Sequence, residues 1–416
     1  MEKNRVLIIG AGSAGLLIAH ALKKLNIPYT VFERDLSSTS RARDWSFGVY
    51  WAQSRLGECL PPGIDENYLL NHAQVDDFCA GEDFYIPCFN GETGELLKKV
   101  MTPYSIRLGR KKFLKVLKED GGIDVKYGKR LSSIKCDPEG DTVTALFEDG
   151  TEEQGALLIG CEGAHSKVRE YLVGAEKAAL RPLPILTNAA VTSFPAEAAL
   201  AIRKIHQRFM FSIHPEGCFI WMSVQDAFDP DPSKWTFMLL QTWPEAGTDM
   251  NVNDVRPNLK TKPAIVEDMR QRASVFAEPW KSIWQAIPDD APVWHNRLSD
   301  WATEPWDNRN GRVTLAGDAA HPMTFHRGQG LNNAISDACT LLHALKDHYS
   351  ANGTSPFAKA LEVYESEVWE RGKEAVLSSA KNSAMVHDWK TVAQSPLLRL
   401  GIKPRDLEGS GDNVEA

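Results

Sequence analysis

Residues 5–33 constrain the possible folds most strongly, because two short apolar runs flank a glycine-rich turn and a segment with helical spacing. Residues 5–9 and 29–32 are apolar runs of strand length, and residues 14–25 repeat apolar side chains at helical spacing. A strand, a helix and a second strand of these lengths predict a right-handed unit with parallel strands. The chain therefore contains the start of a parallel α/β sheet.

The turn after the first strand has the sequence GAGSAG, and its glycines stand where a dinucleotide-binding turn needs them. Gly10 permits a tight turn, Gly12 lets the backbone approach a pyrophosphate, and Gly15 lets the helix pack closely on the sheet. A diphosphate at the helix N-terminus meets free N–H groups and the positive end of the helix dipole. We predict that a dinucleotide contacts this turn, which comprises Gly10, Ala11, Gly12, Ser13, Ala14 and Gly15.

Glu33 ends the second apolar run, at the position where a carboxylate accepts hydrogen bonds from the ribose hydroxyls of a dinucleotide. Its charge repels a 2′-phosphate, which disfavours NADP at this site, although the neighbouring Arg34 weakens that discrimination. We predict that both residues lie at the adenosine end of the cofactor. The turn and Glu33 alone do not separate NAD from FAD.

A segment much later in the chain distinguishes FAD from NAD as the cofactor. Residues 311–318 form a predicted strand that ends in Gly-Asp, and a glycine-bracketed helix start follows at residues 328–335. Asp318 at the strand end can bind a ribityl or ribose hydroxyl. The helix start can present N–H groups to the pyrimidine edge of a flavin, where negative charge develops on reduction. These residues predict FAD as the cofactor, with contacts from Asp318, Gly330, Leu331 and Asn332.

Together with two further motifs, these segments resemble the group A FAD-dependent monooxygenases, which share the para-hydroxybenzoate hydroxylase fold. Residues 158–169, LIGCEGAHSKVR, are similar to the VGADGxxSxVR stretch of that family, and residues 107–114 are similar to the start of one of its helices. By this resemblance Arg110 contacts FAD. An arginine after the second strand also lies near the flavin in that family, and Arg43 either takes this role or forms a surface salt bridge.

Two positions depart from the family pattern. Glu162 stands where the family usually has Asp, which leaves the reductant, NADPH or NADH, less defined. Phe325 stands where the family usually has Pro, in a loop that lies beside the flavin in such enzymes. Fungal enzymes of secondary metabolism resemble this chain in that loop, so the resemblance favours this branch.

The resemblance implies an FAD-dependent monooxygenase that uses NAD(P)H and O2 and acts through a flavin C4a-hydroperoxide. The implied reaction is hydroxylation or epoxidation of an aromatic, polycyclic or terpenoid small molecule. A second GxGxxG motif is absent from the sequence, so we expect the nicotinamide to bind only transiently. Two alternatives stay open: a flavin oxidase or dehydrogenase on the same scaffold, and a non-catalytic FAD-binding redox sensor.

The expected fold class is α/β, with a Rossmann-like FAD-binding domain, an inserted and mostly antiparallel β-sheet substrate domain, and C-terminal helices. We assign residues 1–75, 100–180 and 295–345 to the FAD-binding domain and residues 76–99 and 181–294 to the substrate domain. Residues 346–405 form the predicted C-terminal helices. The polar residues 406–416 form a predicted disordered tail.

Alternating aromatic residues in the predicted insert either line a cavity for a flat substrate or form an ordinary sheet core. Phe209 and Phe211 share one strand face, Trp221 and Ser223 share another, and Phe237 belongs to a third strand.

Two polar residues are candidates for catalysis. Arg208 lies near the predicted sheet of the insert and can polarise a substrate group, and His326 lies in the loop expected beside the flavin.

Composition excludes several other classes of protein. The 416 residues carry 47 basic and 55 acidic side chains, a net charge of −8, which argues against nucleic acid or an anionic membrane surface as a partner. No apolar stretch is long enough to span a bilayer, and the N-terminal residues lack the features of a signal peptide. The 7 cysteines are scattered without a CxxC pair, so we expect free thiols and a cytoplasmic location.

We predict no metal site, because His321, His326 and Asp318 lack a metal-binding spacing and the flavin motif explains Asp318. The expected partner is a small-molecule substrate. The sequence leaves the oligomeric state open.

Overall fold

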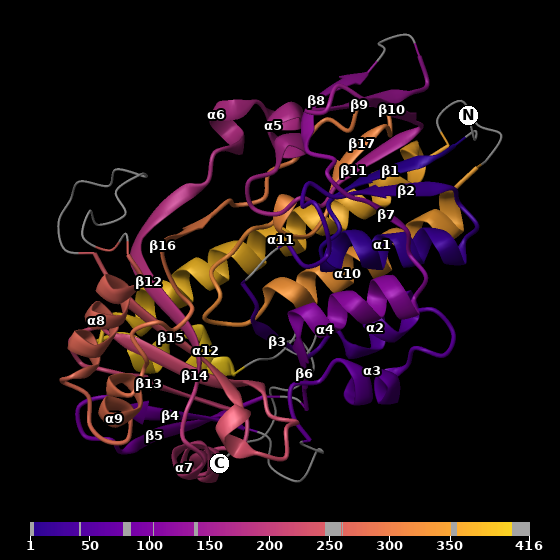
Figure 1. Ribbon diagram of the computed structural model, residues 1–416. Helices are drawn as coiled ribbons and strands as arrows, with labels where there is room; N and C mark the ends of the chain where they lie inside the picture. Colours follow the sequence, from indigo (N-terminus) through magenta and orange to yellow (C-terminus); the bar gives the residue numbers. More distant parts are fainter. Residues whose placement is uncertain are drawn as a thin grey trace, which may run out of the picture.

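A five-stranded parallel sheet carries the first part of the chain in the computed structural model (Figure 1). The structure describes residues 4–40, 43–77, 85–102, 104–136, 140–245, 259, 261–350 and 356–401. In spatial order the strands are β17 (Val313–Leu315), β11 (Leu157–Gly160), β1 (Val6–Ile9), β2 (Tyr29–Phe32) and β7 (Val125–Lys126). All neighbouring pairs are parallel, which confirms the arrangement predicted from residues 5–33.

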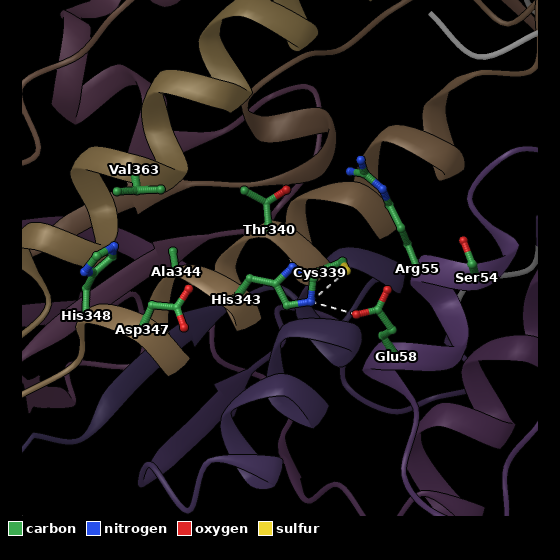
Figure 2. A pocket seen from close by; sticks show the side chains of 10 residues that line it. All are labelled: Ser54, Arg55, Glu58, Cys339, Thr340, His343, Ala344, Asp347, His348 and Val363. Carbon is green, nitrogen blue, oxygen red and sulfur yellow. Dashed lines mark hydrogen bonds and ion pairs between the residues drawn. The ribbon is translucent and has the colours of Figure 1, made fainter. Parts of the chain in front are cut away.

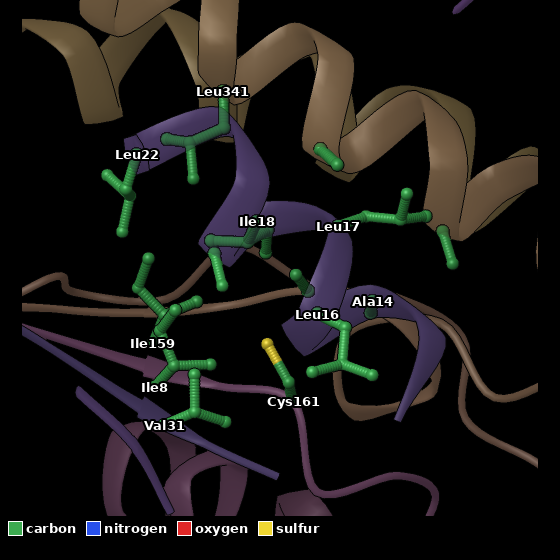
Figure 3. Packing of buried hydrophobic residues seen from close by; sticks show 14 of the residues in the cluster. Ile8, Ala14, Leu16, Leu17, Ile18, Leu22, Val31, Ile159, Cys161 and Leu341 are labelled. Carbon is green, nitrogen blue, oxygen red and sulfur yellow. The ribbon is translucent and has the colours of Figure 1, made fainter. Parts of the chain in front are cut away.

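Helix α1 (Ser13–Lys24) lies between this sheet and helix α10 (Gly330–His348), as Figure 3 shows. Ile8, Val31 and Ile159 come from three neighbouring strands and pack against α1, and Leu341 packs from the side of α10. All four side chains are fully buried. Burial of this apolar face, more than helix propensity, holds α1 at a fixed position on the sheet.

A small antiparallel sheet and two short helices pack on the other side of the parallel sheet, above it in Figure 1. They are β8 (Leu131–Cys136), β9 (Val143–Phe147), β10 (Glu152–Gly155), α5 (Lys167–Val173) and α6 (Ala175–Ala178). Ser166 caps α5 by accepting a hydrogen bond from the backbone N–H of Arg169 at 2.9 Å.

A second large sheet of seven strands lies at the opposite end of the molecule (Figure 1). Its strands in spatial order are β16 (Val293–Asp300), β12 (Arg181–Ser193), β15 (Thr236–Pro244), β14 (Phe219–Asp226), β13 (Phe209–Ile213), β4 (Tyr85–Asn90) and β5 (Leu96–Met101). All pairs are antiparallel except β13 with β4. The inserted, mostly antiparallel sheet that the sequence predicted is therefore present.

The two faces of this sheet have different neighbours. Met222, Phe237 and Leu239 pack in one apolar cluster with helices α8 (Lys262–Ala273) and α9 (Trp280–Gln285). Trp221 lies on the other face, whose side chains reach the cavity described below. The sequence left two alternatives for the aromatic residues, a cavity wall and an ordinary core. Trp221 lies in the cavity wall, whereas Phe237 lies in the core against the helices.

The remaining elements connect the two sheets and cover them. The first part of the chain adds β3 (Ser46–Val49), α2 (Gln53–Cys59), α3 (Glu66–His72), β6 (Ile106–Gly109), α4 (Arg110–Lys115) and a π-helical turn (Val116–Asp120). The later part adds α7 (Ala196–Ile205), α11 (Ala358–Val386), α12 (Pro396–Leu400) and single turns at Pro232–Lys234, Gly317–Ala319 and Val392–Gln394. Strands β3 and β6 form a two-stranded antiparallel ribbon between the sheets.

The seven-stranded sheet extends beyond the predicted substrate domain. Strand β16 continues to Asp300, whereas the prediction ended this domain at residue 294. The strand sequence VWHNRLSD is mostly polar, so it gives no apolar signal for a strand. The other domain limits stay predictions, and residues 406–416 lie outside the described residues. Within the described ranges, no helix has the length and apolar character needed to cross a membrane.

Candidate active site

A cavity of about 1310 Å³ runs from the glycine-rich turn of the parallel sheet to the inner face of the seven-stranded sheet. Its walls at one end come from the β1–α1 turn and the end of β2. Its middle is lined by the segment after β17 and the start of α10, and its far end by β12, β14, β15 and β16. The cavity therefore joins the predicted cofactor site and the predicted substrate domain.

The glycine-rich turn has the geometry that a pyrophosphate requires. Gly10 has φ +106°, and a Cβ at Gly15 would lie 2.0 Å from the carbonyl oxygen of Gly10, so both positions exclude a larger residue. A Cβ at Gly12 would meet no atom within 4 Å, because this residue faces open space in the cavity. Helix α1 begins at Ser13 without a side-chain cap, which leaves its first N–H groups for an anion.

The carboxylate of Glu33 holds the turn from the end of β2. Its Oε2 accepts a hydrogen bond from the backbone N–H of Ala11 at 2.8 Å, and its Oε1 accepts one from Asp35 at 3.0 Å. Each oxygen keeps a second acceptor site, which a ribose hydroxyl can use. Arg34 also lines the cavity and is exposed. The structure thus places Glu33 and Arg34 at the end of the cavity where we predicted adenosine.

The middle of the cavity contains Asp318 beside the first residues of α10. Among the described residues, none forms a hydrogen bond with the carboxylate of Asp318, which is exposed to the cavity. A Cβ at Gly330 would lie 3.9 Å from its Oδ1. Desolvation by the surrounding protein raises the pKa of Asp318, an effect that His321 and Arg169 oppose. An acceptor without a donor, at a helix N-terminus, fits a hydroxyl-bearing cofactor.

Asn332 does not line the cavity, although the sequence analysis placed it among the cofactor contacts. Its Oδ1 accepts a hydrogen bond from the backbone N–H of Tyr50 at 2.8 Å, and its Nδ2 donates to the carbonyl of Gly48 at 3.0 Å. Asn332 therefore fixes β3 against α10 and acts on the cavity only through these elements. Its neighbours Gly330 and Leu331 do line the cavity.

Two arginines of the predicted flavin site line the cavity beside tryptophans. The guanidinium of Arg110 lies over the ring of Trp45 at 4.7 Å, and that of Arg43 lies over the ring of Trp294 at 5.7 Å. Cation–π contacts of this kind position a guanidinium.

His326 lines the cavity, and both of its ring nitrogens are hydrogen-bonded within the protein. Nε2 lies 3.0 Å from Oγ1 of Thr242, and Nδ1 lies 2.8 Å from Oγ of Ser383. Thr242 also contacts Nε2 of His387 at 2.8 Å, and Nδ1 of His387 contacts the carbonyl oxygen of Ser383. Ser383 contacts the cavity-lining hydroxyl of Thr324 at 2.7 Å.

The carbonyl of Ser383 fixes the hydrogen position on the ring of His387. His387 donates from Nδ1 to the carbonyl of Ser383, so Thr242 donates to its Nε2 and accepts from Nε2 of His326. The Nδ1 of His326 faces the hydroxyl of Ser383, whose single proton also faces the backbone carbonyl of Ser379 at 2.9 Å. Burial lowers the pKa of His326 well below its ordinary value and that of His387 to about 4. His326 therefore has no free nitrogen to act as a base directly on a ligand.

Arg208 lies outside the cavity, contrary to the catalytic role that we predicted. Its side chain is fully buried and paired with that of Asp76, to which Nη2 donates a hydrogen bond at 2.8 Å. Its Nη1 donates to the backbone carbonyl of Ser105 at 2.9 Å. Two buried, opposite charges with these bonds form a structural ion pair.

Arg107 is a functional candidate that the sequence analysis did not select. It comes from β6, is 4% exposed and lines the cavity. Its Nη2 donates to Oγ of Ser223 at 2.8 Å, and its buried Nε has no hydrogen-bond partner among the residues that the structure describes. Desolvation lowers its pKa to about 10, so it stays charged at neutral pH. The sequence signal for Arg107 is a charged side chain inside the short apolar run IRLG. The prediction gave a cofactor contact only to Arg110, three residues later.

The residues present fit FAD. The turn offers open space at Gly12 and free N–H groups, Glu33 offers acceptors for a ribose, and no described residue donates a hydrogen bond to the carboxylate of Asp318. The cavity is long enough to pass from this parallel sheet to a second, aromatic-lined sheet. Fold and site together define a dinucleotide-binding flavoprotein with a substrate space next to its cofactor.

Comparisons with known proteins extend this assignment. The family described as FAD binding domain matches residues 3–379. FAD-dependent monooxygenase cctM of Talaromyces islandicus is 47% identical over 406 residues, which cover 97% of this chain and 98% of that protein. FAD-dependent monooxygenase phnB of Penicillium herquei is 34% identical over 408 residues, which cover 97% of this chain and 96% of that protein.

Solved structures show the same fold at low sequence identity. HpxO of Klebsiella pneumoniae, complexed with FAD and uric acid, has a TM-score of 0.71 and 20% identity, covering 98% of this chain and 95% of that chain. The 2,6-dihydroxypyridine-3-hydroxylase from Arthrobacter nicotinovorans has a TM-score of 0.73 and 19% identity, covering 93% of both chains.

The chain belongs to the FAD binding domain family and, within it, to the group A FAD-dependent monooxygenases of fungal secondary metabolism. The predicted family, fold class and type of enzyme are confirmed.

Proposed function

We propose that this monooxygenase uses NADPH or NADH and O2 to hydroxylate or epoxidise an aromatic or polycyclic small molecule that binds as an anion. The substrate lies between the flavin and the seven-stranded sheet. The observation that carries the proposal is the uncompensated charge of Arg107, which faces this part of the cavity.

The buried charges near Arg107 do not balance. Arg208 and Asp76 form a pair, and no carboxylate of the described residues pairs with Arg107. A buried charge without a counter-ion is costly, and an anionic ligand within reach offsets that cost. A phenolate, an enolate or a carboxylate on the substrate supplies such a charge beside the guanidinium of Arg107.

The cavity walls that the seven-stranded sheet contributes suit a flat ring system. Trp221 and Phe219 come from β14, Met238 comes from β15, and Trp294 comes from β16. Aromatic and thioether side chains stack on planar rings and exclude water from them. These walls favour an aromatic or polycyclic substrate and support the substrate class that the family resemblance implied.

FAD held by the glycine turn, Glu33 and Asp318 would supply the redox chemistry, namely hydride acceptance and activation of O2. The chain's own residues bind and orient the two reactants and keep water from them. The hydrogen-bonded chain from Thr324 through Ser383 and His326 to Thr242 and His387 holds one cavity wall in place. It also offers hydroxyl and imidazole groups through which a proton can leave the cavity, with Thr324 as the cavity-facing member.

Matched pairs of ligands test the proposal. Consumption of NADPH and NADH is measured with polycyclic phenols that are ionised near neutral pH and with the methyl ethers of the same compounds. The proposal predicts that a phenol stimulates consumption and that its ether does not. Equal stimulation by both members of every effective pair contradicts the anionic binding mode. Stimulation with quantitative release of hydrogen peroxide favours the oxidase alternative, and slow consumption with every compound favours a redox sensor.

A further inference from the structure

A second cluster of reactive side chains lies away from the cavity, in a pocket of about 380 Å³ between helices α2 and α10 (Figure 2). Glu58 comes from the last turn of α2, and Cys339 and His343 come from α10. Figure 2 shows the imidazole of His343 between the other two groups. The proposed monooxygenase reaction uses none of these residues.

Helical spacing and packing bring the three groups together. Cys339 and His343 are four residues apart on α10 and therefore share one face of the helix. The Sγ of Cys339 lies 3.9 Å from Nε2 of His343, and this nitrogen lies 2.7 Å from Oε2 of Glu58. The three ligand atoms all lie within 4.8 Å of one another.

The thiol of Cys339 is adapted to act as a ligand. It lies at the floor of the pocket and is 2% exposed, whereas the side chains of His343 and Glu58 stay about half exposed at the rim. The thiolate is the form of cysteine that binds metals.

We propose that Glu58, Cys339 and His343 form a binding site for Zn²⁺ that joins α2 to α10. A carboxylate, a thiolate and a neutral imidazole are the ligand types of protein zinc sites. Coordination displaces the thiol proton of Cys339 to solvent. One further position of a tetrahedral ion faces the pocket, where water can fill it.

The spacing of the ligand atoms fits an ion of this size. Tetrahedral zinc with ordinary bond lengths sets sulfur and nitrogen ligands about 3.6 Å apart and nitrogen and oxygen ligands about 3.3 Å apart. The corresponding distances here are 3.9 and 2.7 Å. Both of these pairs reach the zinc geometry with a shift of well under about 1 Å, and the sulfur and the carboxylate oxygen lie within 4.8 Å of each other. Rotamer adjustments of the half-exposed Glu58 and His343 can supply the shifts. The sulfur and nitrogen donors disfavour Mg²⁺ and Ca²⁺, which bind oxygen ligands.

The prediction of no metal site weighed only His321, His326 and Asp318. Cys339 and His343 alone form an unremarkable pair on a helix, and Glu58 joins them only through the packing of α2 on α10. Both helices lead to the cavity, since α10 begins at Gly330 and α2 follows Tyr50. Zinc would therefore strengthen the connection between two elements that border the flavin site.

The test titrates ZnCl₂ into the full chain loaded with FAD, with a thiol reductant present, and follows binding by calorimetry. We expect one equivalent of zinc and no binding of MgCl₂. The variants Cys339→Ser and Glu58→Gln should each weaken zinc binding by roughly tenfold or more. Asp347→Asn is the matched control, because Asp347 lines the same pocket outside the ligand set and should leave binding unchanged.

A second readout identifies the thiolate directly. CoCl₂ in place of zinc should give a sulfur-to-metal charge-transfer band in the difference spectrum, and Cys339→Ser should abolish it. Retention of the flavin spectrum verifies that each variant is folded. Absence of zinc binding to the wild-type chain overturns the proposal. So does equal binding by the wild type and Cys339→Ser, since surface carboxylates and histidines then account for the metal.

Discussion

Two buried arginines near the seven-stranded sheet differ in whether the protein supplies a counter-ion. Arg208 has Asp76 as its counter-ion, whereas Arg107 forms no ion pair with a described residue and contacts Ser223 and the rings of Phe209 and Trp221. A neutral hydroxyl and aromatic faces stabilise a cation less than a carboxylate does. An anionic substrate can therefore act as the counter-ion of Arg107.

Replacing Arg107 by Gln removes the charge and keeps a hydrogen-bond donor. A charge-assisted hydrogen bond contributes about 1.5–3 kcal/mol, so KM for the substrate should rise at least about tenfold, with a smaller effect on kcat. Arg107→Lys, which keeps the charge, should recover part of the loss. Lys359→Gln removes a cation from the exposed pair with Glu362 and serves as the control. Steady-state kinetics measure these effects, and an unchanged KM in Arg107→Gln would show that the substrate binds without this cation.

The buried histidines predict a loss of stability in mild acid. Burial lowers the pKa of His387 to about 4, so the folded state favours the neutral ring, and the unfolded chain takes up the proton first. The resulting stability is fully present above about pH 6.5 and declines as the pH falls toward 4. His326 adds an effect of the same sign, because its pKa is also lowered by burial.

Urea denaturation of the wild type and of His387→Gln at several pH values tests this assignment. Between about pH 6.5 and about pH 5, the free energy of unfolding of the wild type should fall by about 1.5 kcal/mol more than that of the variant. Parallel pH profiles for the two proteins would mean that His387 titrates alike in the folded and unfolded states.

At the scale of elements, the connection between β1 and α1 contains glycines that serve two different functions. Gly15 allows the helix to approach the carbonyl of Gly10, whereas Gly12 borders only open space in the cavity. We expect Gly15→Ala to lower both stability and FAD affinity, because the helix must shift. Gly12→Ala should lower FAD affinity while the melting temperature of the FAD-free protein stays within a few degrees.

Equilibrium dialysis for FAD and thermal denaturation of the FAD-free variants give the two readouts. Tight FAD binding by Gly12→Ala would place the pyrophosphate elsewhere. A stable Gly15→Ala variant would show that α1 has room to move.

Elements with a local pattern could be predicted from the sequence, and those without one could not. Strand β1, helix α1 and strand β2 have apolar periodicity and a glycine turn between them, so residues 5–33 contain all the information that the unit needs. Strand β16 has polar residues at most positions and is a strand because it pairs with β12. Such pairing joins residues that are far apart in the chain, which a local pattern does not encode.

The same difference between local patterns and contacts of distant residues applies to the candidate site. Gly10, Gly12, Glu33 and Asp318 lie in motifs with a physical reason for each residue, and all four line the cavity. Arg208 and Arg107 look alike as sequence letters, and only the position of Asp76 distinguishes a structural pair from a cation that faces the cavity.

At the scale of the whole molecule, the architecture brings two sheets to opposite ends of one cavity. The parallel sheet supplies a cofactor site at its glycine turn, and the seven-stranded sheet supplies apolar walls and a buried cation. The two-stranded ribbon of β3 and β6 carries Arg107 between them. This arrangement favours oxygen transfer to a bound substrate, because the reacting groups can be enclosed away from water.

Turnover under labelled oxygen gas tests the central claim most directly. The purified protein is supplied with NAD(P)H and a substrate that accelerates nicotinamide oxidation, and the product is analysed by mass spectrometry. The account predicts that the product gains one labelled oxygen atom, and that a parallel reaction in labelled water under ordinary oxygen gives unlabelled product. A product without label from the gas, formed together with an equivalent of hydrogen peroxide, would contradict it, once a control shows that the product does not exchange oxygen with water.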